Sequence, residues 1–309
     1  MKKILITGGA GFIGSALVAE LRKAGHDIYV IDNLSFGNRR FIDEINGDHF
    51  FNIDILNRQE LADCVVKINP AWVMHLAAVH FIPFCNEHPF LASNINIQGS
   101  INLLDSCMQL NELEKLFFAS TAAVYPVTDG AINENTEVSA TDIYGLSKIA
   151  GEKIFKEFHS STGLPVLICR FFNAFGPNET NPHLVPAIQE QVNKGIRTLK
   201  LGNLEPKRDY IHTYDMAEAV TLLMKEFKSG FEVFNLGTGQ EYSVREIVDA
   251  FEEELGEKLV IEQDITRMRK SDRMHLLADI SKISSYLSWK PRININEGIR
   301  TMIEKKIPA

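Results

Sequence analysis

Short apolar segments rich in β-branched residues alternate with amphipathic segments of helical length through the first half of the chain. The apolar segments predict strands at 3–7, 27–32, 49–53, 72–75, 115–119 and 165–170. The helical patterns between them cover 13–24, 57–68, 89–110 and 144–160. Strands and helices that alternate in this way predict a parallel sheet covered by helices on both faces, which is a doubly wound α/β (Rossmann) fold.

The alternation stops after Arg170, where several prolines and asparagines predict a turn-rich loop. A later apolar segment, 232–236, has the composition of a further strand. We therefore expect a nucleotide-binding domain over 1–172, to which the strand near 232–236 returns. Residues 173–309 are expected to form mainly a second, smaller mixed α/β domain that binds the substrate.

Composition and charge exclude several classes of protein. The 309 residues are 45% hydrophobic, enough for a large core. A net charge of −8 argues against a nucleic-acid partner, because such proteins need a basic face. No segment approaches the length of apolar residues that spans a membrane, and the start of the chain has the pattern of a strand and not of a signal peptide. The four cysteines are scattered, as expected for a reducing cytoplasm.

Two groups of residues bear on whether the chain binds metal ions or anions. The nine histidines show no His-Glu-x-x-His spacing and the cysteines form no Cys-x-x-Cys pair, so we expect no metal. Four cations fall within seven residues at Arg267, Arg269, Lys270 and Arg273. Taken alone, this cluster is either a solvated charged face or a site for an anionic ligand.

A glycine-rich motif, Gly9-x-Gly11-x-x-Gly14, lies at the first predicted strand-to-helix turn. Glycine there permits a sharp turn and close approach of a pyrophosphate, while the helix N-terminus offers free N–H groups. Asp32 closes the second strand, where its carboxylate can bind a ribose diol and repel a 2′-phosphate. We therefore predict NAD in preference to NADP, the alternative being an ordinary glycine-rich turn. A second Gly-x-Gly, residues 237–239, also follows a strand but lacks the third glycine.

Tyr144 and Lys148 lie four residues apart on one face of a predicted helix. A free tyrosine titrates near about 10, so a neighbouring cation is needed for its phenolate to act as a base. Tyr286 and Lys290 have the same spacing but precede Pro291, and we interpret that pair as coincidental. Thr121 follows the fifth predicted strand, where its hydroxyl either relays a proton or caps a turn.

Together these motifs resemble the extended short-chain dehydrogenase/reductases, and within them the nucleotide-sugar epimerases typified by UDP-glucose 4-epimerase. The resemblance covers almost the whole chain. It rests on residues 7–14, 32–34, 54, 75–78, 96–99, 120–125, 144–148, 170–177, 208–212, 235–239 and 278–281.

The resemblance implies roles for individual residues. NAD would be bound by Gly8, Gly11, Phe12, Ile13, Gly14, Asp32, Asn33, Asp54, Ile55, Leu76, Ala77, Ala78, Asn96, Tyr144, Lys148 and Phe172. The catalytic set would be Thr121, Tyr144 and Lys148. A nucleotide-diphosphate sugar would be held by Thr121, Asn173, Arg208, Arg269 and Leu276, with the two arginines on the diphosphate.

One departure from related enzymes bears on the reaction. The 4,6-dehydratases of this family usually carry acidic residues after the catalytic Ser or Thr, whereas this chain has Ala122 and Ala123. We therefore expect an NAD-dependent epimerase that inverts C4 through a transient 4-keto sugar. The alternatives are a 4-keto reductase or dehydratase and, from another class, a non-catalytic NAD-binding regulator. By resemblance, segments 89–110 and 144–160 would form the four-helix contact of a homodimer.

Overall fold

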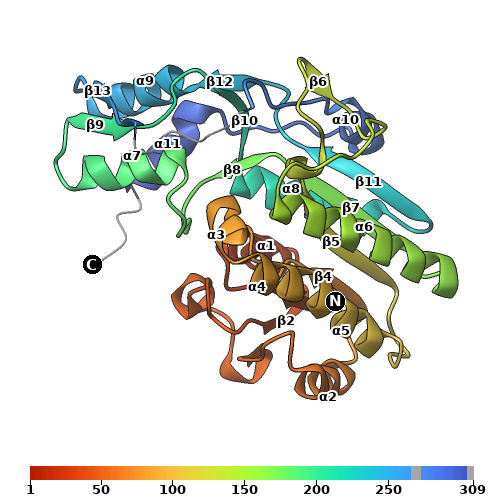
Figure 1. Cartoon of the computed structure of the whole chain (residues 1–309). Helices are drawn as coiled ribbons and strands as arrows, with labels where there is room; N and C mark the ends of the chain where they lie inside the picture. Colours follow the sequence, from red (N-terminus) through yellow and green to blue (C-terminus); the bar gives the residue numbers. More distant parts are fainter. Residues whose placement is uncertain (266–272, 305–309) are drawn as a thin grey trace.

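A seven-stranded sheet forms the centre of the molecule (Figure 1). The computed structural model describes residues 1–265 and 273–304. The sheet has the order β11-β7-β5-β4-β1-β2-β3, and every neighbouring pair is parallel. Its strands are β1 (Lys3–Thr7), β2 (Asp27–Ile31), β3 (Phe50–Phe51), β4 (Trp72–His75), β5 (Lys115–Thr121), β7 (Val166–Phe171) and β11 (Phe231–Leu236). The predicted doubly wound parallel sheet is confirmed.

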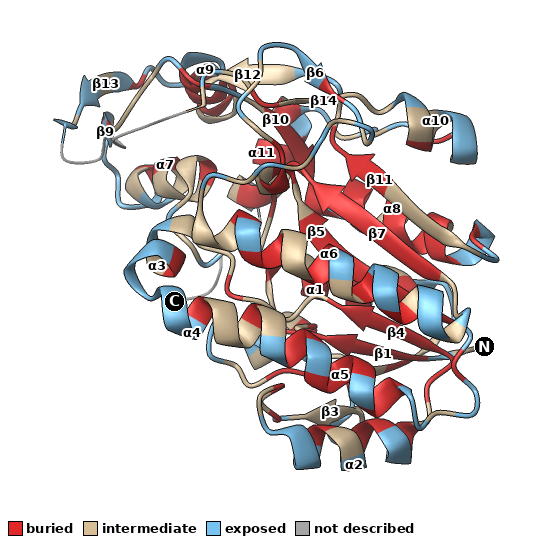
Figure 2. Ribbon diagram, turned by 45° about the vertical axis from the view of Figure 1, so that its right-hand side comes forward, coloured by how far each residue is buried: buried red, intermediate tan, exposed pale blue. Residues whose placement is uncertain are grey.

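Helices cover both faces of this sheet because successive strand residues point to opposite sides. On one face Ile4 and Ile6 pack in a core with α1 (Phe12–Lys23), α8 (Thr213–Glu226) and α10 (Ser281–Leu287). On the other face Leu5 packs in a core with α2 (Arg58–Ile68), α5 (Gly99–Cys107) and α6 (Ile143–Thr162). The strands between the two cores are largely buried (Figure 2).

The predicted helix 89–110 is interrupted in the structure. It consists of α4 (Pro89–Ser93), a π-helical turn (Asn94–Gln98) and α5, preceded by the short α3 (Ile82–Glu87). The side chain of Asn96 explains the wider turn, because it bonds both the N–H and the carbonyl of Val79 and also Ser147. Such π-helical turns commonly mark functional sites, and this one contacts α6.

A smaller set of elements lies at the other end of the chain. A three-stranded sheet contains β8 (Asn173–Phe175), β10 (Lys207–His212) and β12 (Glu241–Ser243). Two further pairs join β9 (Thr198–Leu201) to β13 (Val260–Gln263) and β6 (Ala131–Ile132) to β14 (Leu277–Ala278). Helices α7 (Leu184–Asn193), α9 (Val244–Leu255) and α11 (Ile295–Glu304) enclose a separate core with β8, β9, β10, β12 and β13. This is the second, mixed α/β part that the pattern predicts.

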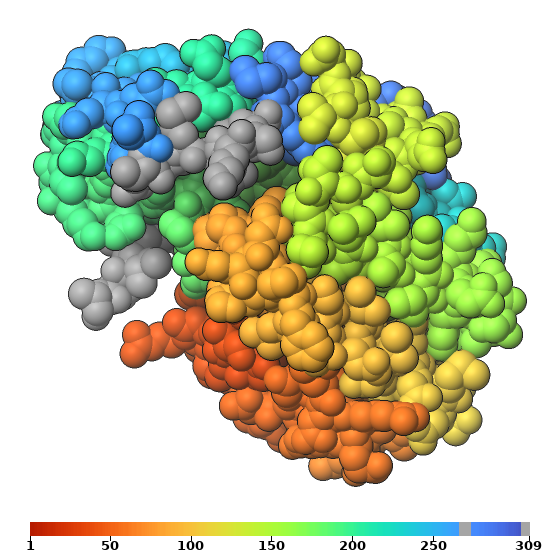
Figure 3. Space-filling model, viewed as in Figure 1, coloured from red at the N-terminus to blue at the C-terminus, as the bar shows by residue number. Residues whose placement is uncertain are grey.

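The described chain contains four short 3-10 or π-helical turns in addition to these elements: Arg39–Ile42, Gly47–His49, Asn94–Gln98 and Ala122–Val124. None of its helices is long and apolar enough to cross a membrane. In the space-filling view red and orange atoms form the lower part of the face, and green-to-blue atoms form its upper left (Figure 3).

The second Gly-x-Gly motif follows β11, and the structure shows what its backbone N–H groups bind. The fully buried Asp209 on β10 accepts hydrogen bonds from the Thr238 N–H and hydroxyl, both at 2.7 Å. Its other oxygen accepts from the N–H groups of Gly239 at 2.9 Å and Ala278 at 3.2 Å. A side-chain carboxylate therefore fills this turn, and it ties β11 of the large sheet to β10 and β14.

We predict that Asp209→Asn lowers the free energy of unfolding by about 2–3 kcal/mol, because an amide keeps the shape but loses one acceptor for buried donors. Urea denaturation of the purified protein measures this. Asp249→Asn on α9 is the matched control: Asp249 is exposed and paired with Arg245, so its loss should change stability by less than about 1 kcal/mol. Equal losses for the two variants would contradict a special role for Asp209.

Candidate active site

The turn between β1 and α1 is packed too tightly for any residue but glycine at two positions. Gly8 has φ +75°, and a Cβ there would lie 2.6 Å from the backbone nitrogen of Ala77. A Cβ on Gly14 would overlap the carbonyl oxygen of Gly8. Helix α1 therefore begins at Phe12, directly after the turn. In the described structure no side chain caps its first N–H groups. Such a helix N-terminus attracts a phosphate.

Asp32 follows β2 and reaches back to this turn. Its carboxylate accepts hydrogen bonds from the N–H of Ala10 at 3.0 Å and of Leu34 at 2.9 Å. Burial raises the pKa of Asp32, and these two backbone hydrogen bonds act in the opposite direction. The residue is 8% exposed, so hydroxyl donors from a ribose would relieve a carboxylate that is poorly solvated.

The other residues assigned to the nucleotide lie along the ends of neighbouring strands. Asn33 donates to Asp54 at 3.0 Å, and Asp54 also accepts from the N–H of Leu56 at 2.8 Å, while Ile55 next to Asp54 is buried. Leu76, Ala77 and Ala78 follow β4. These segments come together because the carboxyl ends of parallel strands meet at one edge of a sheet.

Thr121, Tyr144 and Lys148 come together at the end of β5. Thr121 is the last residue of that strand, and its hydroxyl lies near the phenol of Tyr144 in the first turn of α6. Lys148, one helical turn later, donates to the carbonyl oxygen of Ala119 at 2.8 Å. Its ammonium lies 6.0 Å from the centre of the Tyr144 ring and 4.7 Å from that of Phe118.

Burial perturbs both titrating groups of this set. It raises the pKa of Tyr144, and the hydrogen bond with Thr121 opposes that rise. Burial also lowers the pKa of Lys148 to about 7, with Glu152 acting in the opposite direction. Both groups are therefore held toward their neutral forms, and a positive charge bound beside them would favour the phenolate.

A buried polar network that the sequence analysis does not identify lies behind Lys148. Glu152, one further turn along α6, forms two hydrogen bonds with Arg170, at 2.9 and 2.7 Å. Ser120 donates to the same carboxylate, and Arg170 donates to the hydroxyl of Tyr125 at 2.9 Å. The i, i+4 spacing of Lys148 and Glu152 was a signal for this contact, but only the fold supplies Arg170 from a neighbouring strand.

Apart from Thr121, the residues assigned to the sugar nucleotide lie in the second half of the chain. Asn173 begins β8, directly after the buried Phe172, which is assigned to NAD. Arg208 on β10 donates to the carbonyl oxygen of Arg273 at 2.6 Å. Leu276 is buried in a cluster with Phe172. Arg269 lies outside the described residues, as do Arg267 and Lys270.

Arg273, the one described member of the basic cluster, turns toward the loop that follows β5. Its guanidinium donates to the carbonyl oxygens of Ala123 and Pro126, both at 3.4 Å. Burial lowers the pKa of Arg273, and neighbouring Arg208 lowers it further. The structure therefore places two cations of this region close together, as an anionic ligand would require.

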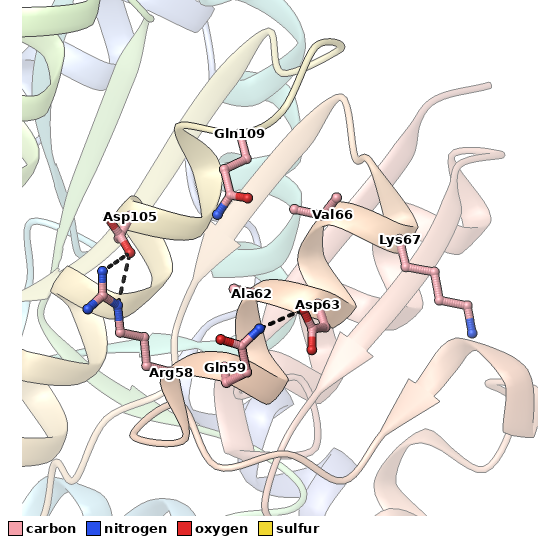
Figure 4. A pocket seen from close by; sticks show the side chains of 8 residues that line it. All are labelled: Arg58, Gln59, Ala62, Asp63, Val66, Lys67, Asp105 and Gln109. Atoms are coloured by element: carbon pink, nitrogen blue, oxygen red, sulfur yellow. Dashed lines mark hydrogen bonds and ion pairs between the residues drawn. The ribbon is translucent and has the colours of Figure 1, made fainter.

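Two other features lie away from these residues. Tyr286, of the second Tyr-x-x-x-Lys match, is 46% exposed on α10 and contacts the ring of Phe234. A surface groove between α2 and the end of α5 is lined by polar side chains and contains the Arg58–Asp105 ion pair (Figure 4). The groove contains none of the residues assigned to cofactor or substrate.

Known proteins resemble the chain over almost its full length. A family model described as GDP-mannose 4,6 dehydratase matches residues 5–302. The UDP-glucose 4-epimerase of Bacillus subtilis is 32% identical over 320 residues, which cover 95% of this chain and 94% of that protein. The UDP-glucose 4-epimerase of Corynebacterium glutamicum is 31% identical, covering 98% of this chain and 94% of that protein.

The chain belongs to this family of nucleotide-sugar dehydratases and epimerases. The solved UDP-glucose 4-epimerase of Thermus thermophilus, in complex with NAD, has the same fold, with a TM-score of 0.88 and 30% identity over 98% of both chains. The resemblance inferred from the motifs is thereby confirmed.

We predict that Asp32→Ala weakens NAD binding and narrows the preference for NAD over NADP. The variant removes both a ribose acceptor and a charge that repels a 2′-phosphate. Isothermal titration of the variant with each cofactor measures both effects. Asp54→Ala serves as the control, because it removes a carboxylate at the next strand that does not face the glycine turn. This variant should weaken the binding of both cofactors alike. An equal weakening of both cofactors by Asp32→Ala would contradict the ribose role.

Proposed function

We propose that this chain is an NAD-dependent epimerase that inverts C4 of a nucleotide-diphosphate sugar through a transient 4-keto intermediate. The observation that carries the proposal is the convergence of Thr121, Tyr144 and Lys148 at the end of β5, with the Lys148 ammonium 6.0 Å from the centre of the Tyr144 ring. This set lies at the same edge of the sheet as the glycine turn, where a dinucleotide would bring its nicotinamide to the sugar. The UDP-glucose 4-epimerases among its relatives support this assignment.

The glycine turn fits NAD, because the dinucleotide needs a tight turn at this point. A Cβ at Gly8 or Gly14 would collide with the protein backbone and open that turn. NAD supplies a hydride acceptor and donor when bound. Tyr144, as phenolate, takes the proton of the 4-hydroxyl directly or through Thr121, while the C4 hydride leaves. Lys148 stabilises the phenolate. Return of the hydride to the opposite face of C4 and of the proton to the 4-oxygen completes the inversion with no net change in cofactor.

Inversion requires the sugar to turn over while the rest of the substrate stays bound. We propose that residues 1–172, together with β11, hold NAD and that residues 173–309 mainly hold the sugar nucleotide. Arg208 and Arg269 would bind the diphosphate, with bidentate hydrogen bonds as guanidinium groups commonly form. Asn173 and Leu276 would face the sugar. UDP is the expected carrier because the relatives act on UDP-glucose by name.

The residues around Thr121 favour epimerisation over the alternatives. Ala122 and Ala123 follow it in a short 3-10 turn, so neither supplies the acid that elimination of water requires. A reductase would consume NADH in proportion to product, whereas an epimerase leaves the cofactor unchanged. A regulator would bind NAD without turnover. Such a protein would gain nothing from an intact set of Thr121, Tyr144 and Lys148.

A panel of UDP-sugars tests the proposal directly. We expect interconversion of one pair of C4 epimers, resolved by chromatography, without accumulation or loss of NADH in its near-ultraviolet absorption. Stoichiometric loss of NADH would indicate the reductase, and release of water with a 4-keto-6-deoxy product would indicate the dehydratase. Binding of NAD without turnover of any sugar would favour the regulator.

We predict that Tyr144→Phe leaves NAD affinity nearly unchanged but lowers kcat by about 10²–10⁴-fold, because it removes the proton acceptor and little packing. Steady-state kinetics on the best sugar and titration with NAD measure the two effects. Tyr286→Phe is the control and should leave both constants within about twofold of the parent. Similar kinetics for the two variants would refute the choice of Tyr144.

We also propose that the chain forms a homodimer through α4, α5 and α6. These helices pack together on one face (Figure 2). They carry exposed apolar side chains at Phe90, Leu91, Ile101 and Leu146, and the exposed Met108 directly follows α5. Phe90 is 84% exposed, which is unusual for a large aromatic side chain on a helix. Two copies facing each other would bury both sets in a four-helix contact.

Phe90→Glu is expected to shift the parent dimer toward a 34.8 kDa monomer, because it places like charges in a symmetric contact. Size-exclusion chromatography with light scattering measures the mass. Val260→Glu on β13 replaces another exposed apolar residue away from this face and should leave the mass unchanged. A monomeric parent would exclude the dimer.

We place the protein in the cytoplasm. All four cysteines, Cys64, Cys85, Cys107 and Cys169, are free and buried. Burial raises the pKa of each thiol, which keeps it unreactive. Unpaired thiols of this kind suit a reducing compartment.

A further inference from the structure

Three side chains of metal-ligating type converge beside the candidate active site. One ligand atom from each of His80, Glu179 and His183 lies within 4.8 Å of the other two. His80 belongs to the loop after β4, whereas Glu179 and His183 lie in the segment between β8 and α7. The fold therefore assembles the group from two distant segments, which is why a search for closely spaced histidines does not find it.

The three groups are partly withdrawn from water, and burial perturbs two of them. It lowers the pKa of His80 to about 4, with further lowering by His183 and Lys148. Burial raises the pKa of Glu179. Within residues 1–265 and 273–304, no Lys or Arg forms an ion pair with Glu179.

A single side-chain amide occupies the space between two of these acceptors. The Asn181 nitrogen lies 3.1 Å from Nε2 of His80 and 3.3 Å from Oε1 of Glu179. The hydrogens of an amide are weakly electropositive, and here the amide nitrogen faces a ring nitrogen of His80 and a carboxylate oxygen of Glu179. A cation would satisfy the same two acceptors more strongly, because burial strengthens its attraction to the carboxylate.

We propose that His80, Glu179 and His183 bind a divalent transition-metal ion of the zinc type. Two imidazoles and one carboxylate are a donor set that zinc enzymes use, with a fourth position left open for water or a substrate oxygen. Binding requires Asn181 to turn away and the three side chains to close around the ion, since zinc bonds are about 2.0–2.2 Å long.

The ion joins two parts of the chain that already touch through weak contacts. In the same loop Asn178 donates to Ser15 on α1 at 3.2 Å, and Thr180 donates to the carbonyl of Phe36 at 3.4 Å. A bound metal fastens this loop to the loop after β4 and so holds it across the nucleotide-binding end of the sheet. The inference is independent of the proposed epimerase activity, because it concerns binding of the ion and not turnover.

Zinc titration tests the site with any affinity tag removed and with the full-length protein stripped of metal by EDTA. We expect calorimetry to show one Zn²⁺ per chain and a rise in Tm on addition of Zn²⁺. Co²⁺ should give the visible absorption of a tetrahedral nitrogen and oxygen site. Glu179→Gln and His183→Ala should each weaken Zn²⁺ binding by about 100-fold or more, since the loss of even a supporting residue costs about 10–100-fold.

Two further variants separate a metal site from other roles of the same residues. His88→Ala removes an exposed histidine close to His80 in sequence and should bind Zn²⁺ as the parent does. Asn181→Ala removes the competing donor and should bind Zn²⁺ at least as tightly as the parent. The proposal is overturned if the parent binds no Zn²⁺ at micromolar concentration, or if His183→Ala and Glu179→Gln bind it as the parent does. Tm and circular dichroism of each variant confirm that it is folded.

Discussion

The close approach of the β1–α1 turn to the loop after β4 constrains much of the rest of the structure. Gly8 lies against the backbone of Ala77, and Gly14 lies against the carbonyl of Gly8. Side chains at these glycines would separate α1 from the sheet, and with it the core that α1 shares with α8. The same contact brings the end of β2, where Asp32 lies, onto the turn. One steric constraint thus sets both the packing of α1 and the geometry of the proposed nucleotide site.

A second constraint is the orientation of α6. Three of its residues at successive turns, Tyr144, Lys148 and Glu152, face the ends of β5 and β7. Tyr144 lies near Thr121 and Glu152 pairs with Arg170, while Lys148 lies between them in a buried environment. The ion pair of Glu152 with Arg170 holds a negative charge beside Lys148. We infer that this pair positions the helix that carries the proton-transfer groups, since a buried ion pair is costly to break and has a defined geometry.

The two parts of the molecule are joined at several points by polar contacts. Asp209 binds the turn after β11, and the loop that contains Asn178 and Asn181 reaches α1 and His80. The first of these contacts is fully buried, whereas the loop contacts are longer and partly exposed. Movement between the parts is therefore expected at the loop, and a metal ion bound there would limit it. The proposed reacting groups, Thr121, Tyr144 and Lys148, lie on β5 and α6.

The sequence by itself determined the features that depend on local pattern. The alternation of strands and helices specified the parallel sheet, and the spacing of Gly9, Gly11 and Gly14 located the nucleotide turn, because a close backbone approach demands glycine at fixed intervals. Tyr144 and Lys148 could be paired for the same reason, since one helical turn separates them. Even the choice between Tyr144 and Tyr286 depended only on the position of each pair along the chain.

Only the tertiary structure decided contacts between distant segments. The π-helical turn in the predicted helix 89–110 follows from the bonds of Asn96 to Val79 and Ser147, which no local propensity encodes. Arg170 meets Glu152, and His80 meets Glu179 and His183, because neighbouring strand ends and loops bring them together. A pattern along the chain identifies residues that share a face of one element, but the packing of separate elements determines which charges and ligands meet.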